Sequence, residues 1–241
     1  MARLPALVQA IADHDDRPAT LIGHFARVLR NEGLIVSNRS GLGAPAMTYQ
    51  DAAVLLMATL GSSAPAGACQ AVVNLRQLTS WGDNLMHSRS GGPLGSMISA
   101  GFAETLTFMI QDADKIAEWE HAYRAHRDAK RHLSSAASHT EAGLGRPLSH
   151  RTVAISCYSE GYSAEIRLGL LQVYGEMPFR EFYRPGPKSE IRSDAEYRES
   201  VGIRVTGVET LLALKRAVDE APPPRSWKQK TNKMSCDGEP S

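Results

Sequence analysis

The fold of this chain is decided by residues 16–60, which have the sequence DRPATLIGHFARVLRNEGLIVSNRSGLGAPAMTYQDAAVLLMATL. At the start of this stretch, Asp16 followed by Arg17 and Pro18 is typical of the beginning of a helix. Gly33 is typical of a helix end. Between them, apolar side chains recur with the spacing of one helical face. The pattern predicts a helix over residues 18–32 that buries Leu21, Ile22, Phe25, Val28 and Leu29.

A second helix is predicted after a glycine-rich loop. Residues 37–45 combine serine, glycine and proline, which is loop composition. Thr48 followed three residues later by Asp51 indicates a capping box, with Asp in place of the longer Glu. The helix over residues 48–60 is apolar around most of its circumference, so only its first turn is free to meet a partner. Two helices that flank such a loop predict a helix-turn-helix or winged-helix character.

The bulk composition sets limits on the class of protein. The chain has 241 residues, of which 42% are hydrophobic, which suffices for a substantial core. No stretch approaches the roughly 18 apolar residues of a membrane span, and the N-terminus lacks the apolar region of a signal peptide. We therefore expect a cytoplasmic protein without a membrane partner. The cysteines are odd in number and widely spaced, which predicts reduced thiols at Cys69, Cys157 and Cys236.

Charge is spread evenly along the chain. The formal net charge is +1, and residues 1–90 hold seven basic and six acidic side chains. The corresponding numbers are six and seven for residues 91–149, and fourteen and thirteen for residues 150–241. Since no section is strongly basic, binding to phosphates would depend on the local placement of a few arginines.

The remainder of the chain predicts an α+β protein. Further helices are expected over residues 4–11, 65–78 and 98–110, and the charged run 112–132 is a solvated helix or a flexible arm. Alternating β-branched and aromatic residues predict a β-hairpin over residues 151–158 and 162–171, with a third strand at 201–205. Thr206 followed by Glu209 indicates a capping box, which would open a helix able to lie across the apolar face of the hairpin.

The predicted elements fall into four parts. Residues 1–81 form a helical, DNA-binding domain, and residues 82–149 form a helix and a flexible connector. Residues 150–221 form a β-hairpin and helix domain, and residues 222–241 form a disordered tail.

Patterns that suggest enzyme chemistry do not fit their templates. The glycines Gly41 and Gly43 match a dinucleotide-binding fingerprint, but no strand ends at the first of them and no acidic strand end follows at the required distance. Glu165 and Arg167 resemble part of a nuclease metal site, yet Arg stays protonated, so we interpret them as a cross-strand surface ion pair.

The histidines offer no convincing metal site either, since their gaps match neither one helical face nor a zinc finger. They lie at His121, His126, His132, His139 and His150. The sequence therefore predicts no catalytic residue, no metal ligand and no cofactor, and we do not expect an enzyme.

The best-supported interaction is with double-stranded DNA. Two arginines lie off the apolar stripe of the first helix, polar residues lie in the glycine-rich loop, and three more open the second helix, where backbone amides favour phosphate. Arg, Asn and Gln side chains also read base edges. The predicted contacts are Arg27, Arg30, Asn38, Arg39, Thr48, Tyr49 and Gln50. An ordinary helical subdomain with a polar surface would explain the same residues.

A resemblance supports this reading. The strings ARVLRNEGLI (residues 26–35) and MTYQDAAVLL (residues 47–56) resemble the N-terminal part of uncharacterised proteins from proteobacterial genomes and prophages. Residues 201–217 resemble their strand-helix ending. The start Thr-x-x-Asp-Ala-Ala is similar to helix starts in helix-turn-helix regulators. The resemblance supplies no established activity or site residues. Our expectation is DNA binding in prophage regulation or packaging. The alternative is a structural or assembly protein that forms homo-oligomers through its apolar helices.

Overall fold

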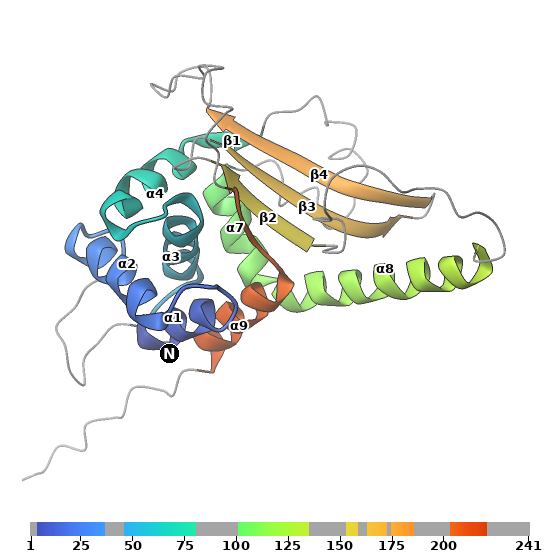
Figure 1. Ribbon diagram of the computed structural model, residues 1–241, viewed down its shortest axis with the longest axis horizontal. Helices are drawn as coiled ribbons and strands as arrows, with labels where there is room; N and C mark the ends of the chain where they lie inside the picture. Colours follow the sequence, from blue (N-terminus) through green and yellow to red (C-terminus); the bar gives the residue numbers. More distant parts are fainter. Residues whose placement is uncertain are drawn as a thin grey trace, which may run out of the picture.

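The computed structural model of the protein describes residues 4–36, 46–80, 101–134, 153–158, 163–172, 175–185 and 203–220 (Figure 1). More of these residues are in helices than in strands. The described α-helices are α1 Leu4–Ala12, α2 Ala19–Asn31, α3 Tyr49–Gly61, α4 Ala68–Arg76, α7 Phe102–Gln111, α8 Ala113–Ser134 and α9 Val208–Asp219, and a 3-10 turn occupies Pro65–Gly67. The described strands are β1 Leu78–Ser80, β2 Val153–Tyr158, β3 Ser163–Gln172, β4 Gly175–Pro185 and β5 Ile203–Thr206.

The helix α2 ends as the sequence predicts, but it begins differently. Its N-cap residue is Pro18 in an extended conformation, without a side-chain cap, so Asp16 does not cap it. At the other end Gly33 has a φ of 71°. Its N–H donates to the Arg30 carbonyl at 3.1 Å, and the Leu34 N–H donates to the Leu29 carbonyl at 2.9 Å. This is a Schellman motif, in which glycine is favoured because side chains with a Cβ rarely adopt such a φ.

The capping box at the start of α3 is confirmed. The Asp51 backbone N–H donates to the Thr48 hydroxyl at 3.1 Å, and the Asp51 carboxylate accepts from the Thr48 N–H at 2.8 Å. The same carboxylate also accepts from the Val36 N–H at 3.4 Å. Asp51 therefore joins the two ends of the segment 37–45, because Val36 precedes that segment and Thr48 follows it closely.

The central element of the core is α3. Its residues from Asp51 to Gly61 are all buried. It packs against α2, α4 and α7, and it also contacts β2 and β5 of the sheet (Figure 1). Because α3 is enclosed on several sides, its apolar composition is satisfied within the chain.

The predicted β-hairpin is confirmed as the antiparallel pair β2 and β3, in which Ile155 lies opposite Ile166. The third predicted strand corresponds to β5, which pairs antiparallel with β2. Two further strands, β4 and β1, were not predicted. They complete a five-stranded sheet with the order β1-β4-β3-β2-β5, in which all neighbouring strands are antiparallel.

The prediction for α9 was wrong in two respects. Its N-cap residue is Gly207, without a side-chain cap, because Thr206 is still the last residue of β5. The helix also packs mainly against α1, α8, α7 and α3 rather than across the hairpin. The strands are instead contacted by α8 on β3, by α3 on β2 and β5, and by α7 on β1.

The predicted N-terminal and C-terminal domains share one hydrophobic core. Buried residues from α1, α3, α7, β2, β3 and α9 belong to a single cluster. The strand β1, which belongs to the predicted N-terminal domain, pairs with β4. Residues 135–149 of the predicted connector and the tail 222–241 lie outside the described residues. None of the described helices combines the length and apolar character needed to span a membrane.

Candidate functional site

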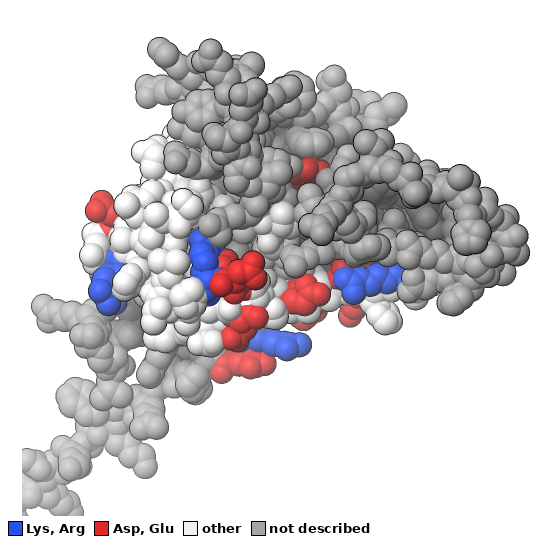
Figure 2. All heavy atoms as spheres, in the orientation of Figure 1, with Lys and Arg blue, Asp and Glu red and all other residues white. Residues whose placement is uncertain are grey.

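The seven predicted DNA contacts fall in different places in the structure. Arg27 and Arg30 lie on the exposed face of α2, three residues apart. Neither guanidinium has an ion pair or hydrogen bond within the part of the chain that the structure describes. On the face of the molecule shown in Figure 2, the described Lys and Arg side chains are separated by uncharged or acidic ones. The basic surface is thus local rather than continuous.

Thr48 and Tyr49 are engaged within the protein. The Thr48 hydroxyl is part of the capping box of α3. The Tyr49 hydroxyl donates to the carboxylate of Asp219 on α9. Lys215 completes this group, with Nζ 2.9 Å from Asp219 Oδ2 and 5.9 Å from the centroid of the Tyr49 ring. We call Tyr49, Lys215 and Asp219 the α3–α9 latch, because they connect the first turn of α3 to the last turn of α9.

The pKa values of the latch favour its paired state at neutral pH. Burial raises the pKa of the Tyr49 phenol, and its hydrogen bond to Asp219 adds to this effect. The hydrogen bonds from Tyr49 and from Lys215 lower the pKa of the Asp219 carboxyl. The hydrogen bond with Asp219 raises the pKa of Lys215. Tyr49 thus has a partner inside the protein and is not a free side chain at a helix start.

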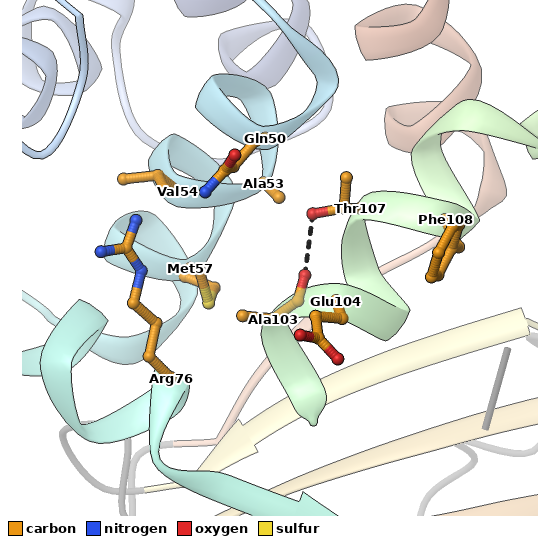
Figure 3. A pocket seen from close by; sticks show the side chains of 9 residues that line it. All are labelled: Gln50, Ala53, Val54, Met57, Arg76, Ala103, Glu104, Thr107 and Phe108. Carbon is orange, nitrogen blue, oxygen red and sulfur yellow. Dashed lines mark hydrogen bonds between the residues drawn. The ribbon is translucent and has the colours of Figure 1, made fainter. Parts of the chain in front are cut away.

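Gln50 lies elsewhere again, at a groove between three helices (Figure 3). The groove has a volume of about 390 Å³. Its floor is α3, its walls are α4 and α7, and it is lined by Gln50, Ala53, Val54, Met57, Arg76, Ala103, Glu104, Thr107 and Phe108. In Figure 3, the side chains of Arg76 and Glu104 come from opposite walls of the groove. Sequence reasoning did not find this groove, because its walls are separated in the chain and no motif marks them.

Asn38 and Arg39 lie outside the described residues. Arg39 follows Val36 by three positions in the sequence, and the Val36 N–H is held by Asp51.

Burial limits what α3 can offer a partner beyond its first turn. A recognition helix must present one face to base edges in the major groove. In α3 every residue from Asp51 onwards is buried, and in its first turn Tyr49 is bound to Asp219. Among the predicted residues that the structure describes, Arg27 and Arg30 on α2 and Gln50 at the groove remain exposed and free of internal partners.

Other candidate chemistry also changes with the structure. Glu165 is only 4% exposed, so the prediction that it belongs to a surface ion pair is wrong about its location. No group of three or more His, Cys, Asp or Glu residues suited to a metal ion occurs among the described residues.

The two described cysteines have raised pKa values. Burial raises the pKa of the Cys157 thiol to about 12. Burial also raises the pKa of the Cys69 thiol, and the negative charge of Glu32 adds a smaller increase. Both thiols are therefore protonated and weakly nucleophilic at neutral pH.

Comparisons with protein-family models, with curated proteins and with solved structures gave no match.

The α3–α9 latch gives a testable effect on stability. Replacing Tyr49 by Phe should lower the free energy of unfolding by about 0.5 to 1 kcal/mol near pH 7, because it removes one hydrogen bond to a carboxylate on a solvated surface. Because the pKa of Asp219 is lowered in the folded state, its carboxylate contributes to the free energy of unfolding above about pH 4. This contribution is lost as the pH falls through the folded-state pKa. Because the pKa of Tyr49 is raised in the folded state, the contribution of its phenol to the free energy of unfolding is lost as the pH rises above about 10.

Urea unfolding of wild type and Tyr49→Phe near pH 7 and near pH 3 measures this difference. The matched control is Tyr123→Phe, since Tyr123 is half-buried on α8 and forms no hydrogen bond with a described residue. Its effect should be small and independent of pH. A stability difference for Tyr49→Phe that is the same at both pH values would contradict the role of Asp219.

Proposed function

We propose that this protein binds double-stranded DNA through phosphate contacts made by α2, and not by insertion of α3 into the major groove. The observation that carries the proposal is the pair of exposed arginines, Arg27 and Arg30, which have no partner among the described residues. Binding a phosphate would break no existing ion pair at either position. Arginine side chains are common donors to DNA phosphates because their charged N–H groups match the phosphate oxygens.

The geometry of α2 supports two contacts on one side of the helix. Side chains three residues apart lie on adjacent turns and project to the same face. His24 is exposed three residues before Arg27, and Thr20 is exposed one turn earlier, so the face is polar along its length. The buried face of α2 carries Ile22, Phe25, Ala26 and Leu29. DNA contact with the polar face would therefore leave the core untouched.

The burial of α3 also bears on the kind of DNA binding. Sequence is read by side chains that reach base edges, whereas phosphate contacts fix position and carry no sequence information directly. The free arginines on α2 are suited to phosphates, and the polar side chains at the start of α3 are occupied or lie at the groove. We therefore favour binding with little sequence preference, which suits DNA packaging better than operator recognition.

A salt titration with Arg27→Ala/Arg30→Ala tests the proposal. If both arginines contact phosphates, the variant should bind DNA more weakly, to a similar extent for all sequences. Its plot of log affinity against log salt concentration should have a slope smaller by about 1.8, since each lost phosphate contact removes about 0.9 from the slope. Fluorescence anisotropy with labelled duplexes of differing sequence gives both quantities.

The matched control is Arg216→Ala, because Arg216 is an exposed arginine on α9 with no partner among the described residues. It removes the same charge from a different helix and should leave the slope unchanged. Thermal melts of all variants establish that they are folded. Absence of binding by wild type at about 50 mM salt would refute DNA binding. An unchanged slope in the double variant would refute the placement of the contacts on α2.

A further inference from the structure

The groove between α3, α4 and α7 has side chains at its walls and rim that are not satisfied within the chain. Its floor consists of Ala53, Val54 and Met57, which are apolar and already buried. At its rim, Phe108 on α7 is 42% exposed, which is unusual for so large an apolar side chain. Contact with water is unfavourable for the Phe108 ring, so covering this side chain would be favourable.

One basic and one acidic side chain line the groove, and neither of them forms an ion pair with a described residue. Arg76 lies on the α4 wall and Glu104 lies on the α7 wall (Figure 3). The two side chains form no ion pair with each other, and neither has a partner among the described residues. A strongly acidic or strongly basic partner would satisfy one of them and repel the other. A matching surface would carry an acid opposite Arg76, a base opposite Glu104 and an apolar group for Phe108.

We propose that this groove binds the same surface of a second copy of the chain, in a two-fold symmetric dimer. In such an interface each contact occurs twice: residue i of the first copy meets residue j of the second, and residue j of the first copy meets residue i of the second. Arg76 of each copy then faces Glu104 of its partner copy, and Phe108 of each copy covers apolar surface of the other. The one surface thereby supplies the acid, the base and the apolar group that it requires. The inference does not depend on DNA binding by α2.

Charge reversal provides a sharp test. Arg76→Glu should weaken dimer formation by about 10-fold or more, because both symmetric contacts become pairs of acids. Glu104→Arg should weaken it similarly, because both contacts become pairs of bases. The double variant Arg76→Glu/Glu104→Arg should associate nearly as well as wild type, since the reversed charges match again. An equimolar mixture of the two single variants should form a heterodimer that is tighter than the homodimer of either single variant.

Sedimentation velocity at about 1 to 100 µM protein measures these states, because non-obligate interfaces commonly dissociate in or below this range. The control Arg216→Glu makes the same charge change on α9, outside the groove, and should leave association unchanged. Phe108→Ala should weaken association by about 10-fold or more, since exposed aromatic residues often dominate interface energies. This variant keeps the test decisive if a charge-reversal variant does not fold, which circular dichroism would reveal.

Three outcomes would overturn the proposal. Wild type could remain monomeric over the whole concentration range, which would leave the groove to a different molecule. It could dimerise without any effect of Arg76→Glu, Glu104→Arg or Phe108→Ala, which would place the interface elsewhere. The double variant and the mixture of single variants could both fail to associate while folded, which would exclude the reciprocal pairing of Arg76 with Glu104.

Discussion

Replacement of Tyr183 by alanine is expected to lower the free energy of unfolding by about 3 to 5 kcal/mol, the range measured for large aromatic residues in protein cores. Tyr183 lies on β4, has 0% exposure and is the largest fully buried side chain among the described residues. Its ring meets that of Phe102 on α7 in an edge-to-face arrangement, with centroids 5.2 Å apart and an interplanar angle of 63°. The side chain thus fixes the sheet against α7, and its removal would leave a cavity at this junction.

Tyr183→Phe separates the ring from the hydroxyl. The Tyr183 hydroxyl donates to Thr105 Oγ1 at 3.1 Å, and the Thr105 hydroxyl in turn donates to the Gly101 carbonyl at 3.1 Å. The phenylalanine variant keeps the ring packing and should lose about 1 kcal/mol. Chemical unfolding monitored by circular dichroism measures both variants. A loss below about 1 kcal/mol for Tyr183→Ala would mean that the sheet is not fixed to α7 through this ring.

Arg17→Met is expected to destabilise the protein by about 2 to 4 kcal/mol, because it removes several charged hydrogen bonds and leaves polar partners buried without a donor. The Arg17 side chain is 9% exposed and forms two hydrogen bonds with the Asp15 carboxylate, at 2.7 and 2.6 Å. It also donates to the carbonyls of Thr59 at 2.7 Å and of Ser62 at 3.3 Å. Its guanidinium carbon lies 5.2 Å from the centroid of the Phe25 ring.

These contacts explain why Arg17 matters for α3. The last turn of α3 contains no basic residue. The positively charged Arg17 side chain therefore supplies the hydrogen bonds to carbonyls at the C-terminal end of α3 and stabilises the negative end of the helix dipole. Arg17→Lys should recover only part of the loss, because an ammonium group cannot reproduce the planar arrangement of donors.

Arg30→Met is the matched control for Arg17→Met. Its guanidinium has no partner among the described residues, so its effect should stay within about 0.5 kcal/mol. Urea unfolding curves compare the three variants with wild type. Equal effects of Arg17→Met and Arg30→Met would contradict the role assigned to Arg17.

The candidate site could be predicted only in part. Helical periodicity correctly placed Arg27 and Arg30 on the exposed face of α2, since the face of a residue follows from its spacing to the buried stripe. It could not reveal that Tyr49 binds Asp219, because these residues are 170 positions apart. The groove was missed for the same reason, since it combines residues of α3, α4 and α7. The described basic side chains on the face in Figure 2 are scattered, as expected for a chain in which no section is strongly basic.

The unpredicted strands have a physical explanation. The strand β4 contains Pro178, which lacks a backbone N–H, and a proline in a run of residues argues against an internal strand. It lies opposite Gly169 of β3, and β4 is nevertheless paired on both sides, with β3 and with β1. The strand β1 has only three residues, which is too short to show an alternation of apolar and polar side chains.

The sequence by itself determined the local elements of this protein. The Schellman motif at Gly33, the capping box of Thr48 and Asp51, and the antiparallel hairpin follow from residues close together in the chain, so neighbouring side chains and backbone geometry suffice to specify them. The tertiary structure decided how the elements combine. Arg17 meets Ser62 from 45 positions away, and Tyr183 meets Thr105 from 78 positions away. Such contacts depend on the packing of whole helices and strands around α3, which no local pattern specifies.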